Sequence, residues 1–145
     1  MKGGYCSVLE FKELKEGKVL EPLMKEPVTK VQLVQYAGAS GDFNPLHTDD
    51  EFARRIGMDG VIAHGMLIMG FLGEYVMKLA GTNAEITRFR MRFAGMTRPG
   101  DVISCSTVVE KVYEEEGGQY VSLSLTASKS PEETVGSGQA VLRFH

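Results

Sequence analysis

The chain has 145 residues, the length of one ordinary domain, and its 43% hydrophobic and 24% charged residues are typical of a globular protein. A formal net charge of −3 argues against the broad basic surface on which nucleic-acid binding depends. We therefore expect a single domain over residues 1–145 and no nucleic-acid partner.

The sequence gives no signal for export or for membrane insertion. Residues 1–17 lack the apolar stretch of a signal peptide. The longest run of apolar and glycine residues, Gly65 to Gly73, is shorter than the about 20 residues that a spanning helix needs. Cys6 and Cys105 match no metal or redox spacing, so we expect two free thiols in a reducing compartment and a cytoplasmic protein.

Two short helices are predicted in the first half, after an extended segment at residues 17–28 that two prolines confine to a sheet edge. Thr29 can cap a helix over 30–40, which Gly38 and Gly41 end. A Thr-x-x-Glu capping box at residues 48–51 predicts a second helix over about 49–56. In the first helix, two apolar faces compete for the core: Val31, Val34 and Ala37, or Leu33 and Tyr36.

Residues 63–81 are apolar on nearly every face, which predicts a long, buried central helix. Glu74 and Lys78 are spaced to form an ion pair on its single wet stripe. Its glycines suggest that the backbone comes close to a sheet, a partner or a ligand. They are Gly65, Gly70 and Gly73.

The second half alternates with a period of two, which predicts strands. Residues 86–95 have an apolar face of Phe89, Met91 and Phe93 and a basic face of Arg88, Arg90 and Arg92. A turn at 98–101 follows, and then three more strands, at 102–115, 119–130 and 134–144. We expect an α+β fold in which a four-stranded antiparallel meander wraps around the central helix.

Two sites are candidates for chemistry. Asp42 and His47 lie on the irregular connection between the first two helices and could act as an acid/base pair through one water, or could be ordinary turn residues. His64 and Gly65 begin the central helix, where the Gly65 N–H could stabilise an oxyanion. Helix–sheet packing would also explain Gly65, and a capping or buried histidine would explain His64.

Residues 40–53, SGDFNPLHTDDEFA, resemble the hydratase-2 signature of the MaoC-like dehydratases, a family with the hot-dog fold. In that signature an aromatic residue precedes a Gly-Asp-x-Asn-Pro-aliphatic-His core, and a small residue follows it. The matching positions are Tyr36, Gly41, Asp42, Asn44, Pro45, Leu46, His47 and Ala53. Residues 63–66, AHGM, are similar to the start of the family's central helix.

The resemblance implies reversible syn hydration of a trans-2-enoyl thioester to the (R)-3-hydroxyacyl thioester. Asp42 and His47 would hold the water and exchange the α-proton, Gly65 N–H would bind the thioester oxygen, and Asn44 would brace the loop. The acyl group would arrive on CoA or on a carrier protein, and the enzyme would be a homodimer or higher homo-oligomer without metal or redox cofactor. Gly73 aligns with a serine that lines the site in one relative, so the pocket differs there.

Three further features carry weaker hypotheses. The arginines at 88, 90 and 92 could contact the phosphates of CoA or a carrier protein, or could simply be solvated. Met66, Met69, Met77 and the phenylalanines could line an acyl tunnel, although core packing explains them first. A metal site built from Asp42, His47, Asp49 and His64 is not favoured, because the paired spacing on one helix is missing.

Two other functions stay open from the sequence. A hot-dog thioesterase would use a carboxylate and a water to attack the carbonyl carbon instead. A non-catalytic acyl-CoA-binding protein or partner subunit of a dehydratase is the second alternative, and such a subunit would be expected to have lost Asp42 or His47.

Overall fold

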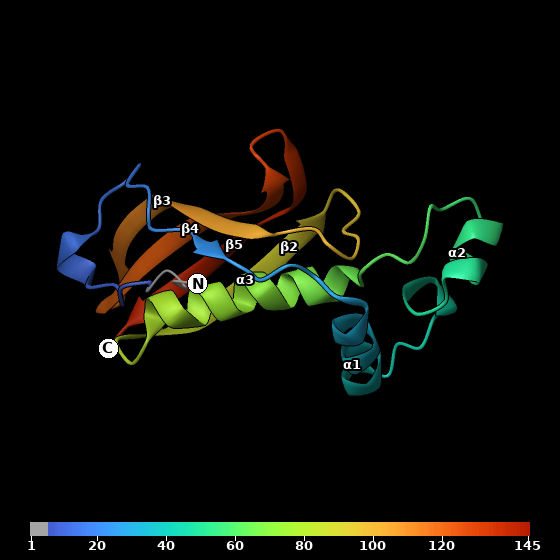
Figure 1. The fold of residues 1–145 in the computed structure, drawn as a ribbon. Coiled ribbons are helices and arrows are strands. Elements are labelled where there is room, and N and C mark those ends of the chain that lie inside the picture. The colour runs from blue at the N-terminus through green and yellow to red at the C-terminus, as the bar shows by residue number, and fades with distance from the viewer. Residues whose placement is uncertain (1–5) are drawn as a thin grey trace.

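A curled antiparallel sheet wraps around one long helix in the computed structural model, which describes residues 6–145 (Figure 1). Within these residues the sheet has five strands in the order β1-β3-β4-β5-β2. The strands are β1 (Leu23–Met24), β2 (Ala84–Phe93), β3 (Ser104–Glu115), β4 (Gly118–Ser130) and β5 (Glu133–Phe144). The predicted α+β layout is confirmed.

The position of β2 differs from the predicted four-stranded meander. Strands β3, β4 and β5 do follow one another as hairpins, but β2 pairs with β5, with Ala84 opposite Phe144. Two strands joined by a short turn must lie next to each other in the sheet. The connection between β2 and β3, residues 94–103, is longer than such a turn and carries the chain across to the other side of the sheet.

Helix α3 (Gly65–Ala80) supplies most of the core on one side. Its buried residues are Leu67, Ile68, Phe71, Leu72, Tyr75, Val76, Leu79 and Ala80. The prediction of burial on nearly every face is wrong for one stripe, where Met66 is 54% and Met77 62% exposed. The predicted ion pair is confirmed, since Lys78 Nζ lies 3.2 Å from Glu74 Oε1.

The first helix, α1 (Lys30–Ser40), begins and ends as predicted. The Thr29 hydroxyl accepts a hydrogen bond from Gln32 N at 3.0 Å, and Gly41 ends the helix in the left-handed region with φ 76°. The buried face combines residues of both predicted faces: Leu33 and Ala37 pack inward, while Val31 and Val34 are exposed.

The second helix, α2 (Asp50–Arg55), is capped by Asp49 and not by Thr48 as predicted. The Asp49 carboxylate accepts hydrogen bonds from Glu51 N and Phe52 N, so a carboxylate one residue further on replaces the hydroxyl. A 3₁₀ turn, η2 (Pro45–His47), precedes it. Figure 1 shows α1 and α2 beyond the end of the sheet, past the N-terminus of α3.

The N-terminal part of the described chain is mostly extended. It contains one 3₁₀ turn, η1 (Phe11–Glu13), and contributes only the two-residue edge strand β1, shorter than the predicted segment 17–28. Cys6 and Cys105 are free, as predicted, and burial raises the pKa of the Cys105 thiol to about 12. Among residues 6–145, no helix is both long and apolar enough to cross a membrane.

Candidate active site

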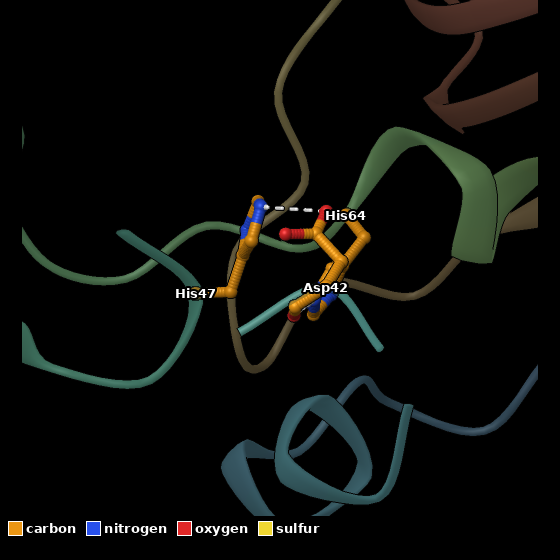
Figure 2. Close-up of side chains that lie close together, drawn as sticks. All are labelled: Asp42, His47 and His64. Atoms are coloured by element: carbon orange, nitrogen blue, oxygen red, sulfur yellow. Dashed lines mark hydrogen bonds and ion pairs between the residues drawn. The ribbon is translucent and has the colours of Figure 1, made fainter. Parts of the chain in front are cut away.

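His47 is held by a hydrogen bond from its imidazole to the main chain. Its Nδ1 lies 2.8 Å from the carbonyl oxygen of Ile62. Because a carbonyl oxygen can only accept, Nδ1 carries the proton, and in the neutral ring Nε2 keeps its lone pair. This Nε2 lies 3.9 Å from Oδ2 of Asp42 (Figure 2).

Asp42 is fixed by short-range hydrogen bonds in the loop after α1. Its backbone N–H donates to Ser40 Oγ at 3.2 Å, and its Oδ1 accepts from Asn44 N at 3.3 Å. Asn44 in turn accepts from Leu46 N at 3.0 Å, as expected of a residue that braces the loop. The pair thus sits in an Asx-type turn that leaves Oδ2 free to face His47.

His64 connects this loop with the start of α3. Its side chain is 2% exposed, and Nε2 donates to the carbonyl oxygen of Asp42 at 3.1 Å. Its ring stacks on that of His47 with centroids 3.8 Å apart and meets the Tyr36 ring edge-on at 4.7 Å. The remaining nitrogen, Nδ1, is buried without a hydrogen-bond partner.

Gly65 is the first residue of α3, where N–H groups have no partner within the helix and the helix dipole is positive. A Cβ added at Gly65 would lie 3.0 Å from Cδ1 of Phe93, so the close approach of this ring also favours glycine here. The packing explanation and the oxyanion hypothesis are therefore compatible. The missing side chain of Gly65 makes room for Phe93, and the Gly65 N–H is available to bind an oxyanion.

The separation of Asp42 Oδ2 and His47 Nε2 suits an acid/base pair that works through a water. At 3.9 Å they are too far apart for a good direct hydrogen bond, yet one water can lie within hydrogen-bond reach of both. The Asp42 side chain is 53% exposed and that of His47 11%, so solvent reaches the pair from the carboxylate side.

A metal ion fits this cluster less well. Ligand atoms of Asp42, His47 and His64 all lie within 4.8 Å of one another. The two imidazoles, however, are stacked with only 24° between their planes, so their in-plane lone pairs do not converge on one point as metal ligation requires. Asp49 caps α2 and does not join the cluster. The absence of a metal cofactor stays a prediction.

The arginines of β2 do not join the Asp42–His47 cluster. Arg88, Arg90 and Arg92 alternate with the inward-facing Phe89 and Met91 and so lie on the sheet face opposite α3. Arg90 donates to Gln139 Oε1 at 2.8 Å beside a shallow hollow of about 460 Å³. Their role in binding phosphates stays a prediction.

One group that helps to form the site is a main-chain carbonyl, which no residue type in the sequence reveals. The carbonyl oxygen of Ile62 selects the tautomer of His47 across 15 residues of chain. Any residue offers such a carbonyl, so only the fold could reveal it. The stacking of His64 on His47 likewise depends on how the loop returns to α3.

The fold and the loop that carries Asp42 and His47 point to one class of protein, and comparison with known families agrees. Residues 12–129 match the MaoC-like domain family, so the chain belongs to that family. This confirms the resemblance that the 40–53 segment indicates.

Two curated proteins are similar to this chain over most of its length. The chain is 28% identical to the 3-hydroxybutyryl-CoA dehydratase of Methylorubrum extorquens, over 94% of this chain and 84% of that protein. It is 27% identical to the (R)-specific enoyl-CoA hydratase of Rhodospirillum rubrum, over 73% of each. Both are named for adding or removing water, so at the level of the family the chain stands with the hydro-lyases.

Solved structures support the fold. The unliganded R-hydratase of Pseudomonas aeruginosa superimposes with a TM-score of 0.81 at 21% identity, over 92% of this chain and 84% of that one. The curled sheet around α3 is therefore the hot-dog fold, as the resemblance implies.

Proposed function

We propose that this chain catalyses the reversible hydration of trans-2-enoyl thioesters to (R)-3-hydroxyacyl thioesters. The observation that carries the proposal is the placement of Asp42 Oδ2 and His47 Nε2, 3.9 Å apart, on a loop that His64 ties to the N-terminus of α3. Names of the family relatives, which include a dehydratase and a hydratase of CoA thioesters, support it.

In the hydration direction, a water held between Asp42 and His47 gives a proton to the pair as its oxygen adds to Cβ of the substrate. The electrons of the double bond move toward the thioester, whose oxygen becomes an enolate stabilised by the Gly65 N–H. The pair then returns the proton to Cα, and the enolate collapses to the thioester. Because both protonation states belong to one coupled pair, the mechanism assigns them to the pair jointly.

The substrate is an acyl-CoA or an acyl-carrier thioester in this proposal, and no metal or redox cofactor takes part. The enzyme works as a homodimer or as a higher homo-oligomer. The relative named as a 3-hydroxybutyryl-CoA dehydratase carries a CoA thioester in its name, which favours CoA as the group that delivers the acyl chain.

The test is loss of the conjugated enoyl-thioester absorbance when the protein is added to crotonyl-CoA, with chiral analysis of the product. We expect the (R)-alcohol, with the thioester intact. Asp42→Asn should lower kcat by at least about a thousandfold while still binding acyl-CoA, since it removes one of two groups that move the proton.

A matched control is Asp59→Asn, which changes an aspartate whose side chain is 88% exposed and forms an ion pair with Arg98 on the surface. Release of free CoA without hydration would replace the proposal by a thioesterase. Unchanged turnover in a folded Asp42→Asn variant would remove Asp42 from the catalytic pair.

A further inference from the structure

Asp50, the first residue of α2, holds the chain segment that orients His47. Its Oδ1 accepts a hydrogen bond from Val61 N at 2.9 Å, across 11 residues of chain. The next residue, Ile62, has its carbonyl oxygen 2.8 Å from His47 Nδ1, and its own N–H donates to Leu46 O at 3.2 Å. A continuous series of contacts thus links the Asp50 carboxylate to the imidazole of the proposed acid/base pair.

The Val61 N–H depends on Asp50 for its hydrogen bond. Val61 is 3% exposed, so water does not readily replace the carboxylate as the acceptor. Gly60 leaves the space for this carboxylate, since a Cβ added there would lie 3.0 Å from Asp50 Oδ1. Because an unpaired buried N–H is unfavourable, the segment around Val61 would have to shift toward another acceptor if Asp50 were removed. The carbonyl of Ile62 would move with that segment.

Lys30, the first residue of α1, contacts the other oxygen of the same carboxylate. Its Nζ donates to Asp50 Oδ2, which ties α1 to α2 at this point. The hydrogen bond from Lys30, followed by that from Val61 N, lowers the pKa of Asp50 below its ordinary 3.8. Asp50 is therefore ionised at neutral pH, and an ionised carboxylate only accepts hydrogen bonds.

We propose that Asp50 is a positioning residue for the hydration reaction. Through Val61 and Ile62 it keeps the proton of His47 on Nδ1, so that Nε2 can accept a proton from the water. The inference rests on the proposed function and adds a residue outside the Asp42–His47 pair. A neutral imidazole carries its proton on either nitrogen, and the hydrogen bond made by one nitrogen decides which. If the Ile62 carbonyl moves out of reach, the tautomer with Nε2–H gains population, and that nitrogen no longer acts as a base.

Three variants separate the hydrogen bond from the charge. Asp50→Ala removes both, Asp50→Asn keeps an oxygen for Val61 N without the charge, and Lys30→Met removes the ion pair alone. We expect Asp50→Ala to lower kcat for crotonyl-CoA by about 10- to 100-fold with KM little changed, because small misplacements of reacting groups have effects of this size. Asp50→Asn and Lys30→Met should keep most of the wild-type kcat.

Nitrogen NMR of the His47 side chain gives a second readout, which does not depend on turnover. In the neutral imidazole we expect the wild type to carry its proton on Nδ1 and Asp50→Ala to show a mixture of both tautomers. A loss of stability alone would not change which nitrogen is protonated in the folded molecules. Asp50→Ser, whose oxygen falls short of Val61 N, should show the same change to a smaller degree and replaces the alanine variant should that not fold.

Glu51→Ala is the matched control. Glu51 is the acidic neighbour of Asp50 in the first turn of α2, and its side chain is exposed. Both substitutions remove a negative charge from the N-terminus of this helix, where such charges are favourable. Glu51→Ala should therefore weaken α2 to a similar extent and keep both the wild-type kcat and the wild-type tautomer of His47.

The outcomes separate the two proposals. Wild-type kcat and a proton still on His47 Nδ1 in a folded Asp50→Ala or Asp50→Ser variant overturn the positioning role and leave the hydratase in place. Equal losses of kcat in Asp50→Asn and Lys30→Met assign the effect to the ion pair and overturn the link through Val61. Absence of hydration by the wild type overturns the proposed function, whereas a changed tautomer in Asp50→Ala still shows that Asp50 orients His47.

Discussion

His64 contacts the loop that carries Asp42 and His47 in two ways, through its Nε2 and through its ring, while its Nδ1 has no hydrogen-bond partner. It donates to the Asp42 carbonyl at 3.1 Å, and its ring supports the His47 ring at 3.8 Å. Because its own ring is 2% exposed, it has no direct path to solvent. We propose that His64 is a positioning residue that fixes the loop relative to Gly65.

Variants of His64 can separate these two contacts. Phe at this position keeps an aromatic ring but loses the N–H to Asp42, whereas Gln keeps an N–H donor and loses the ring. We expect His64→Phe to lower kcat by about 10- to 100-fold with KM little changed, since small misplacements of reacting groups have effects of this size. His64→Gln should recover part of the loss if the hydrogen bond dominates.

The measurement is steady-state kinetics with crotonyl-CoA, accompanied by thermal unfolding. A purely structural role would lower Tm and the amount of active enzyme without changing kcat per active site. A folded His64→Phe variant with wild-type kcat would show that the hydrogen bond to Asp42 does not position the pair.

At the scale of elements, a helix end was predicted correctly where neighbouring residues alone decide it. Thr29 caps α1 as predicted, because a hydroxyl and an N–H three residues on are all that is needed. Thr48 and Asp49 both satisfy the local rule for α2, and the sequence alone does not rank them. Likewise Leu33 and not Val31 faces the core, a choice that only the packing partner decides.

Glu74 on helix α3 forms ion pairs with two lysines, and their contribution to stability depends on pH. Glu74 Oε2 lies 2.5 Å from Lys25 Nζ, and Glu74 Oε1 lies 3.2 Å from Lys78 Nζ. The hydrogen bond from Lys25, followed by that from Lys78, lowers the pKa of Glu74 below its ordinary 4.5 against the opposing effect of burial. A carboxyl whose pKa is lower in the folded state stabilises that state once ionised.

Glu74→Gln should therefore reduce the free energy of unfolding by about 1 kcal/mol or less at pH 7, the range for partly exposed ion pairs. The difference from wild type should shrink as pH falls below 4.5 and vanish below the lowered pKa of Glu74, where both chains are neutral at this position. Urea unfolding at several pH values measures it. Glu132→Gln, in the exposed turn after β4, is the control, and a cost that persists in acid would contradict the ion-pair explanation.

For the whole molecule, the sequence predicted the layers but not the strand order. Alternation identified β2 as a strand with an apolar and a basic face, yet nothing in residues 86–95 says which neighbour it takes. Its partner is β5, whose residues lie far away in the sequence: Ala84 is opposite Phe144. The proximity of Asp42 and His47 was predictable because the two residues are close in sequence. The hydrogen bond of His47 to the carbonyl oxygen of Ile62 was not.

The exposed stripe of α3 is the other departure from the predicted fold, and it bears on assembly. Met66 and Met77 lie on one helix face, next to β2, a ten-residue edge strand whose far side has no partner among the described residues. A bare edge strand beside an apolar stripe is a surface that favours association. A second copy of this chain fits the homo-oligomer of the proposed function.

We expect the protein to sediment as a dimer, at twice the 15.9 kDa of the chain. Met77→Asp should shift it toward monomer, because a carboxylate in an apolar interface is left unpaired and desolvated. Hydratase activity should fall in parallel if the dimer completes the site. Val108→Asp is the matched control, since Val108 is also exposed but lies on β3, outside the α3 stripe. A wild-type monomer that is fully active at assay concentrations would show that one chain forms the whole site and would leave the methionine stripe without a part in assembly.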